Sequence, residues 1–172
     1  MLDDLTEKIQ SSRNKFEELI GKVPGYAGYK QKEQRREADK ILRLHVARQY
    51  EEQLGRLNRV QYALTESGRL ASIVTLERAG MKLQLLIDRI KTASYGYSGL
   101  FDAIKVDEAA LDRLYDFDLA MLEGVSEISA LLDKLSDAAA AEAGTAAEAN
   151  DLVDALERLN TTFSSRQDVI VS

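Results

Sequence analysis

The stretch DEAALDRLYDFDLAMLEGVSEISALLDKLSD, residues 107–137, decides the fold that the sequence predicts. Apolar side chains recur along it at alternating intervals of three and four residues, which places them on one face of a helix. Asp107 is a suitable N-cap, and acidic residues fill the first turn, as the helix dipole favours. We call the line of inward-facing positions the seam of the segment. It consists of Leu111, Leu114, Asp118, Met121, Val125, Ile128, Leu132 and Leu135.

The same period predicts four further helices, over residues 1–20, 30–67, 69–93 and a segment after residue 149. The first break contains Pro24 and glycines, and proline ends helices because it lacks a backbone N–H. Ser67-Gly68 is a possible turn, and the alanine-rich stretch 138–149, which contains Gly144, is a second joint. Residues 166–172 are expected to form a tail.

Residues 69–93 form the most apolar of these segments. A helix with an apolar face this broad is usually covered from more than one side. One stripe contains Ile73, Leu76, Gly80, Leu83, Ile87 and Ile90, and the residues that widen it are Leu70, Val74, Met81 and Leu86.

Seams held over several heptads favour long helices packed at shallow angles. We therefore predict an all-α protein, an elongated antiparallel bundle or coiled coil of four to five helices, with one domain over residues 1–165. Its charge is divided along the chain. Residues 1–101 contain 18 Lys and Arg against 13 Asp and Glu, and residues 102–172 contain 5 against 16, so the halves have net charges of +5 and −11.

Composition favours a cytoplasmic protein. The sequence contains no cysteine, which excludes disulfides and thiolate chemistry and is typical of a reducing compartment. The first residues are acidic, unlike a secretory signal, and no apolar run approaches the roughly 20 residues that span a bilayer.

Two loops resemble each other, Gly25-Tyr26-Ala27-Gly28-Tyr29 and Gly96-Tyr97-Ser98-Gly99-Leu100. Each follows one helix and precedes a longer one, so a duplicated helix–loop–helix unit is one interpretation. The tyrosines either cap the bundle ends, with the ring inward and the hydroxyl outward, or form a binding patch at one end. The members of that patch would be Tyr26, Tyr29, Tyr95 and Tyr97.

No constellation of residues predicts catalysis, a metal or a cofactor, and we expect no enzyme. His45 is the only histidine, so it cannot supply a di-iron site. Arg43 and Arg48 beside it oppose its protonation. The acids Glu108, Asp112, Asp116, Glu123 and Glu127 form a ladder that is more typical of a solvated helix face than of a cation site.

Two groups of charged residues are candidates for interaction. Asp118 occupies a seam position, where an ionised carboxylate is expensive unless it is paired. It fixes the register of the helices, sits at a hydrated point where the helices diverge, or meets a cation from the basic half. The second group is the basic stretch 30–48, which could face acidic helices, touch anionic lipid or bind nucleic-acid phosphates. Its candidate residues are Lys32, Arg35, Arg36 and Arg43. The net charge of −6 disfavours nucleic acid.

These features predict a non-enzymatic helical scaffold or adaptor that acts by self-association, most simply as a homo-oligomer, or by docking a protein partner. The order of a basic helical hairpin followed by acidic helices resembles the membrane-remodelling proteins of the PspA and ESCRT-III type. That resemblance implies an alternative, a peripheral membrane protein that uses the basic face of residues 30–48.

Overall fold

The computed structural model describes residues 2–26, 28, 32–93 and 108–171, and this part of the chain consists of five helices. They pack against one another, so the predicted all-α bundle is confirmed. The helices are α1 (Leu2–Lys22), α2 (Lys32–Glu66), α3 (Ile73–Thr92), α6 (Glu108–Ala140) and α7 (Ala146–Val171).

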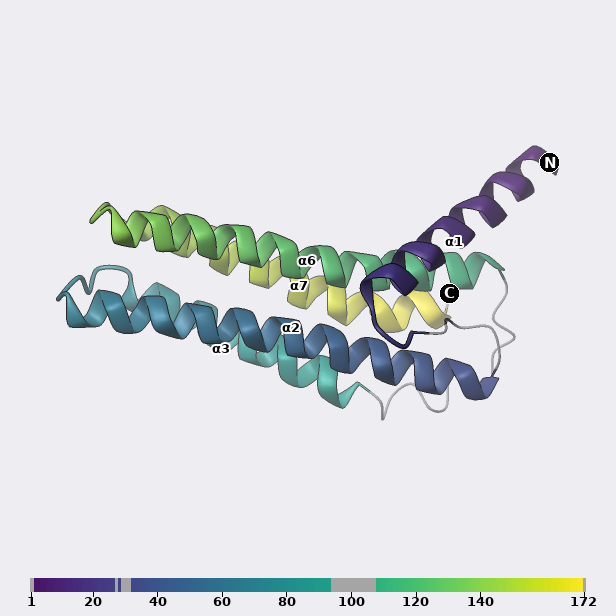
Figure 1. The fold of residues 1–172 in the computed structure, drawn as a ribbon, viewed down its shortest axis with the longest axis horizontal. Coiled ribbons are helices and arrows are strands. Elements are labelled where there is room, and N and C mark those ends of the chain that lie inside the picture. The colour runs from purple at the N-terminus through teal and green to yellow at the C-terminus, as the bar shows by residue number, and fades with distance from the viewer. Residues whose placement is uncertain (1, 27, 29–31, 94–107, 172) are drawn as a thin grey trace.

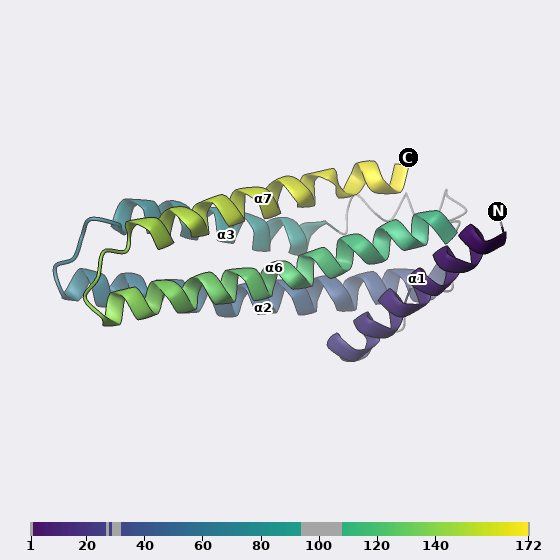
Figure 2. The same ribbon diagram turned by 90° about the horizontal axis from the view of Figure 1, so that it is seen from above.

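Two antiparallel hairpins, α2–α3 and α6–α7, lie side by side with both turns at the same end (Figure 1). Helix α2 contacts α3 and α6, and α7 contacts the same two helices, so the four enclose one core. Across the hairpins, α2 runs parallel to α6 and α3 runs parallel to α7 (Figures 1 and 2). The antiparallel packing that the sequence predicts therefore holds within each hairpin and not between them.

Helix α1 packs on α6, and its N-terminal end points away from the bundle axis (Figures 1 and 2). Lys15 ties it to α6: its Nζ lies 2.6 Å from Asp116 Oδ1 and 2.9 Å from Asp112 Oδ1. Burial lowers the pKa of Lys15, but hydrogen bonds to the two carboxylates raise it more, so the net shift is upward. The ammonium therefore stays charged at this junction.

The core is aliphatic, and the seams point into it. Burying such side chains is the main favourable term in folding. Fully buried core residues include Leu57, Leu64, Leu76, Leu83, Ile128, Leu132, Leu135, Leu152 and Leu156.

The two hairpin turns have the same geometry. Gly68 (φ +73°) and Glu142 (φ +55°) adopt the left-handed conformation directly after α2 and α6. In both turns the next residue donates back five positions, Arg69 to Leu64 and Ala143 to Ala138, which is the Schellman pattern of a helix end. The turn at Ser67-Gly68 is thus confirmed. In the second joint a glutamate, rather than Gly144, takes the left-handed position.

The residues that precede the second helix of each hairpin also correspond. Ser72 precedes α3, Thr145 precedes α7, and the Thr145 hydroxyl donates to Ser72 Oγ at 2.9 Å. This likeness agrees with the predicted duplication, although the second Gly-Tyr loop lies outside the described residues. The predicted tail is wrong in part, because α7 continues to Val171. Residues 146–171 contain neither glycine nor proline, so nothing in that segment ends the helix.

Candidate functional site

The predicted tyrosine patch is not on the surface at the one position that the structure describes. Tyr26 is buried, and its hydroxyl oxygen is buried as well. Its ring centroid lies 6.5 Å from that of Phe16, which in turn lies 5.9 Å from Tyr115 of α6. Tyr26 therefore closes the junction between α1 and α6. Tyr29, Tyr95 and Tyr97 lie outside the described residues.

The basic stretch does not present all of its arginines to solvent. Arg43 is only 8% exposed, so its predicted place on a basic surface is wrong. Its Nε donates to Asp39 at 2.7 Å, and its Nη1 donates to the carbonyl oxygens of Ile90 (3.4 Å) and Lys91 (3.2 Å). Arg43 thus holds the C-terminal end of α3 against α2, as cations at helix ends do.

The other three basic candidates, Lys32, Arg35 and Arg36, lie on the first turns of α2, and their side chains are outside the described part.

Asp118 lies in the interior of α6 and is 2% exposed. It borders a cavity of about 20 Å³ that is otherwise lined mainly by apolar side chains. Arg43 borders the same cavity, so a buried acid and a buried base from opposite halves of the chain line one small cavity in the core. The other lining residues are Leu42, Val46, Ile90, Phe117, Met121 and Phe163.

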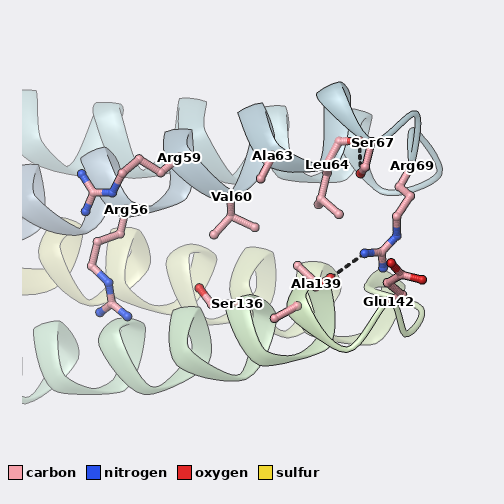
Figure 3. Close-up of a pocket in the computed structure, with 11 residues that line it drawn as sticks. Arg56, Arg59, Val60, Ala63, Leu64, Ser67, Arg69, Ser136, Ala139 and Glu142 are labelled. Atoms are coloured by element: carbon pink, nitrogen blue, oxygen red, sulfur yellow. Dashed lines mark hydrogen bonds between the residues drawn. The ribbon is translucent and has the colours of Figure 1, made fainter.

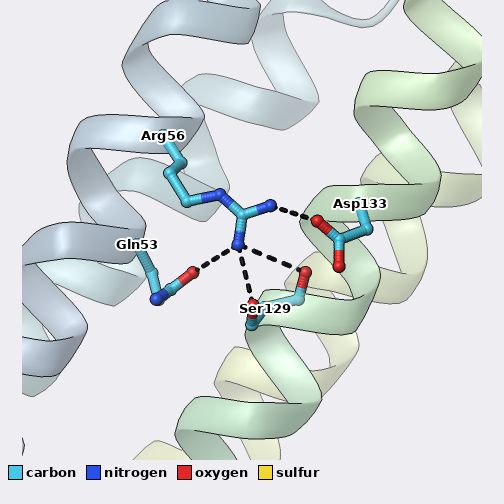
Figure 4. A network of polar contacts seen from close by, with 4 residues as sticks. All are labelled: Gln53, Arg56, Ser129 and Asp133. Carbon is cyan, nitrogen blue, oxygen red and sulfur yellow. Dashed lines mark hydrogen bonds and ion pairs between the residues drawn. The ribbon is translucent and has the colours of Figure 1, made fainter.

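The basic and acidic halves pair within one chain, through residues that the sequence did not single out. Besides Lys15, Lys82 of α3 binds Glu157 of α7 at 2.8 Å, and Arg56 of α2 binds Asp133 of α6. Figure 4 shows Arg56 at the centre of a network, where its Nη1 also donates to Gln53 Oε1 (2.9 Å) and Ser129 Oγ (2.8 Å). These partners are far apart in the sequence, so local sequence patterns could not predict that they pair.

A groove of about 460 Å³ lies between α2 and α6 near the turns (Figure 3). Two of its arginines form hydrogen bonds within the bundle: Arg56 belongs to the network above, and Arg69 donates to the carbonyl of Ala139 at 2.6 Å. Arg59, which also lines the groove, forms no hydrogen bond or ion pair with any residue that the structure describes. Apolar and small side chains form most of the remaining lining, together with the single acid Glu142. These residues are Val60, Ala63, Leu64, Ser67, Ser136, Ala139, Ala140 and Glu142.

The remaining chemical candidates form contacts with other residues of the chain. His45 is half-buried and its Nε2 lies 3.1 Å from Gln49 Nε2. Burial, and after it the nearby Arg48 cation, lower the pKa of His45. Asp112 and Asp116 of the acidic ladder bind Lys15. Within the described ranges, no group of three or more His, Asp or Glu side chains is placed to hold a metal ion.

The most unusual surface is the outer side of α3. Leu70 in the turn before α3, and Val74, Met81 and Leu85 on α3, are 58%, 76%, 67% and 51% exposed, and we call these four residues the α3 apolar face. Sequence analysis expected Leu70, Val74 and Met81 to be covered. Within the described part of the chain, α2 and α7 cover the opposite side of α3, where Leu76, Leu83, Ile87 and Ile90 are buried. Among the residues that the structure describes, no helix covers the α3 apolar face.

Comparison with models of known protein families finds no match for this chain, and comparisons with curated proteins and with solved structures find none either. Among the helices described here, none is both long enough and apolar enough to cross a bilayer. Any functional conclusion rests on the surfaces above.

Proposed function

We propose that this chain is a non-enzymatic helical scaffold or adaptor that docks a protein chain, in the first place a second copy of itself, on the α3 apolar face. The exposure of Leu70, Val74, Met81 and Leu85 is the observation that carries the proposal. Contiguous apolar patches on a folded protein mark interaction surfaces, because covering them removes apolar area from water at about 25 cal/mol per Å².

The ion pairs within the chain predict how the association of such an assembly depends on salt concentration. Lys15, Arg56 and Lys82 of the basic half already have acidic partners in the same chain. Pairing of whole basic and acidic halves between copies is therefore not needed. Association through an apolar face is expected to persist at high salt, where exposed charge pairs are screened.

The test is the solution mass by light scattering, at low and at high salt, over a dilution series. We expect a species heavier than the monomer at both salts, and a monomer for the double variant Val74→Glu/Met81→Glu. The matched control is Ser126→Glu, which changes an exposed position on α6. Circular dichroism checks that each variant is folded. An unchanged mass for the double variant refutes this docking surface, and so does a monomeric wild type that binds no protein partner through it.

Peripheral membrane binding is the second candidate. Lys40, Leu44 and Arg48 follow one another every four residues on α2, all are exposed, and an apolar side chain between two cations suits an anionic bilayer surface. Vesicle co-sedimentation with and without anionic lipid tests it. Loss of binding in Lys40→Glu/Arg48→Glu supports the membrane proposal, and retention of binding contradicts it. Arg43 is unsuitable for this test because it is buried.

A further inference from the structure

Two rows of opposite charge flank the α3 apolar face. Glu77 and Asp88 are three helical turns apart and therefore lie on one side of it. Arg78 and Arg89 have the same spacing and lie on the other side. All four positions belong to the α3 helix, with Arg89 half-buried and the others exposed.

The contacts of α3 identify the two sides. Arg89 donates to Asn160 Oδ1 of α7 at 3.2 Å, so the basic row lies toward α7. Lys91, which binds Glu51 of α2, points to the opposite side. The acidic row of Glu77 and Asp88 therefore lies toward α2, and the apolar face separates the two rows.

From this pattern we infer that the occupant of the α3 apolar face is a second copy of the chain, with the two α3 helices parallel and related by a twofold axis along their length. Such an axis exchanges left and right, so the acidic row of one helix faces the basic row of the other. Glu77 then lies opposite the partner's Arg78, and Arg78 opposite the partner's Glu77. The apolar residues meet in register, Val74 against Val74 and Met81 against Met81.

The antiparallel alternative has the opposite electrostatics. A twofold axis perpendicular to the helices keeps each row on its own side, so Glu77 faces Glu77 and Arg78 faces Arg78 across the contact. Like charges in such positions oppose association and opposite charges favour it. The charge pattern thus selects the parallel arrangement, although both bury the same apolar face.

This inference rests on the proposed self-association and adds its geometry. A contact between single helix faces is expected to fall below the roughly 1,200 Å² of a standard interface, so the dimer should dissociate on dilution. Its test must therefore distinguish the orientation of the helices from the existence of a dimer.

Cysteine cross-linking makes that distinction, because the native chain has no cysteine to give a background. In the parallel dimer, Val74→Cys links to itself and Met81→Cys links to itself, since a disulfide needs Cα atoms about 4.4–6.8 Å apart. In an antiparallel dimer centred between residues 77 and 78, identical positions are about 10 Å apart along the axis. There only a mixture of the two variants links efficiently. Ser126→Cys on α6 is the matched control and should stay monomeric on a non-reducing gel.

Charge exchange provides the second measurement. In the parallel dimer, Glu77→Arg places one arginine opposite each copy's Arg78. We therefore expect the dissociation constant to rise about 2–30-fold, the range for losing two exposed ion pairs. The exchanged variant Glu77→Arg/Arg78→Glu restores opposite charges and should restore the affinity. All these side chains are exposed, so folding should be unaffected.

The possible outcomes separately test the parallel geometry, the contact through α3 and self-association itself. Self-linking at both positions with rescue by charge exchange supports the parallel dimer. Linking only in the mixture overturns the parallel geometry and leaves self-association through α3 intact. A dimer by light scattering that links in neither experiment overturns the inferred contact, and a chain that is monomeric throughout overturns the inference together with self-association.

Discussion

Gly124 of α6 lies against Tyr50 of α2 and Leu159 of α7, and Gly124→Ala tests that packing. A Cβ built there would lie 2.5 Å from Tyr50 Oη and 2.5 Å from Leu159 Cδ2, well inside contact distance. The Tyr50 hydroxyl cannot move away freely, because it donates to the carbonyl oxygen of Met121 at 2.8 Å and the whole side chain is buried. Alanine at this position must therefore displace a core side chain.

The expected magnitude is a difference between two effects. Overpacking a core typically costs about 1–3 kcal/mol. Replacing glycine by alanine inside a helix contributes about 1 kcal/mol of stabilisation. The variant should thus lose roughly 0–2 kcal/mol of unfolding free energy. Gly55→Ala is the matched control: its built Cβ meets only Arg59 Nη1, at 3.7 Å, so it should gain about 1 kcal/mol.

Thermal unfolding followed by circular dichroism measures the separation of the two variants. For a chain of this size, about 1–3 kcal/mol between them corresponds to about 2–12 °C in Tm. Tyr50→Phe removes the hydroxyl that the new methyl group would strike, so its cost should be smaller in the Gly124→Ala background than alone. An equal rise in Tm for both alanine variants would refute the close approach of α6 to Tyr50 and Leu159.

Two further predictions concern charge in the bundle. Arg43→Met removes a buried cation from Asp39 and should lower the unfolding free energy by about 3–5 kcal/mol in urea denaturation. Arg48→Ala, at an exposed position on the same helix, is the control and should change the unfolding free energy by less than about 0.5 kcal/mol. Equal effects of the two substitutions would place Arg43 at the surface. Because the folded-state pKa of His45 lies below its ordinary value of 6.5, its contribution to stability is complete above that pH and is lost as the pH falls toward the folded-state pKa. His45→Gln should therefore flatten the pH dependence of the urea midpoint just below pH 6.5, and an unchanged profile would contradict this assignment.

The helices and their inward faces were predictable because they follow from local spacing. For Arg43, the same spacing was sufficient to predict an inward-facing side chain, whereas the basic composition of the segment wrongly suggested an exposed one. It continues the line of Ala47, Tyr50, Leu54 and Leu57 at intervals of four, three, four and three, which is the inward face of α2. Its neighbours on the chain are basic and suggested a charged surface, but periodicity and not local charge sets the direction of a side chain.

The neighbours of each helix were not predictable in the same way. Nothing in the spacing says that α3 runs beside α7 and in the same direction, since that depends on long-range packing and on the connection between the hairpins. The apolar residues around α3 predicted cover on several sides, whereas the described part of the chain covers only the inner side of this helix. Sequence pattern alone does not distinguish a residue buried by its own chain from one left for a partner.

The docking of α1 on α6 has a consequence for how the chain folds as it is made. Lys15 and Asp112 are 97 residues apart, so at about 5–20 residues per second the first helix waits roughly 5–20 s for its partner. During that interval the emerging chain is the basic half alone, and Arg56 and Lys82 have not yet met Asp133 and Glu157. Helix α1 can thus dock only after α6 has been made, and a ribosome that stalls between α3 and α6 presents the α2–α3 hairpin without its acidic partners.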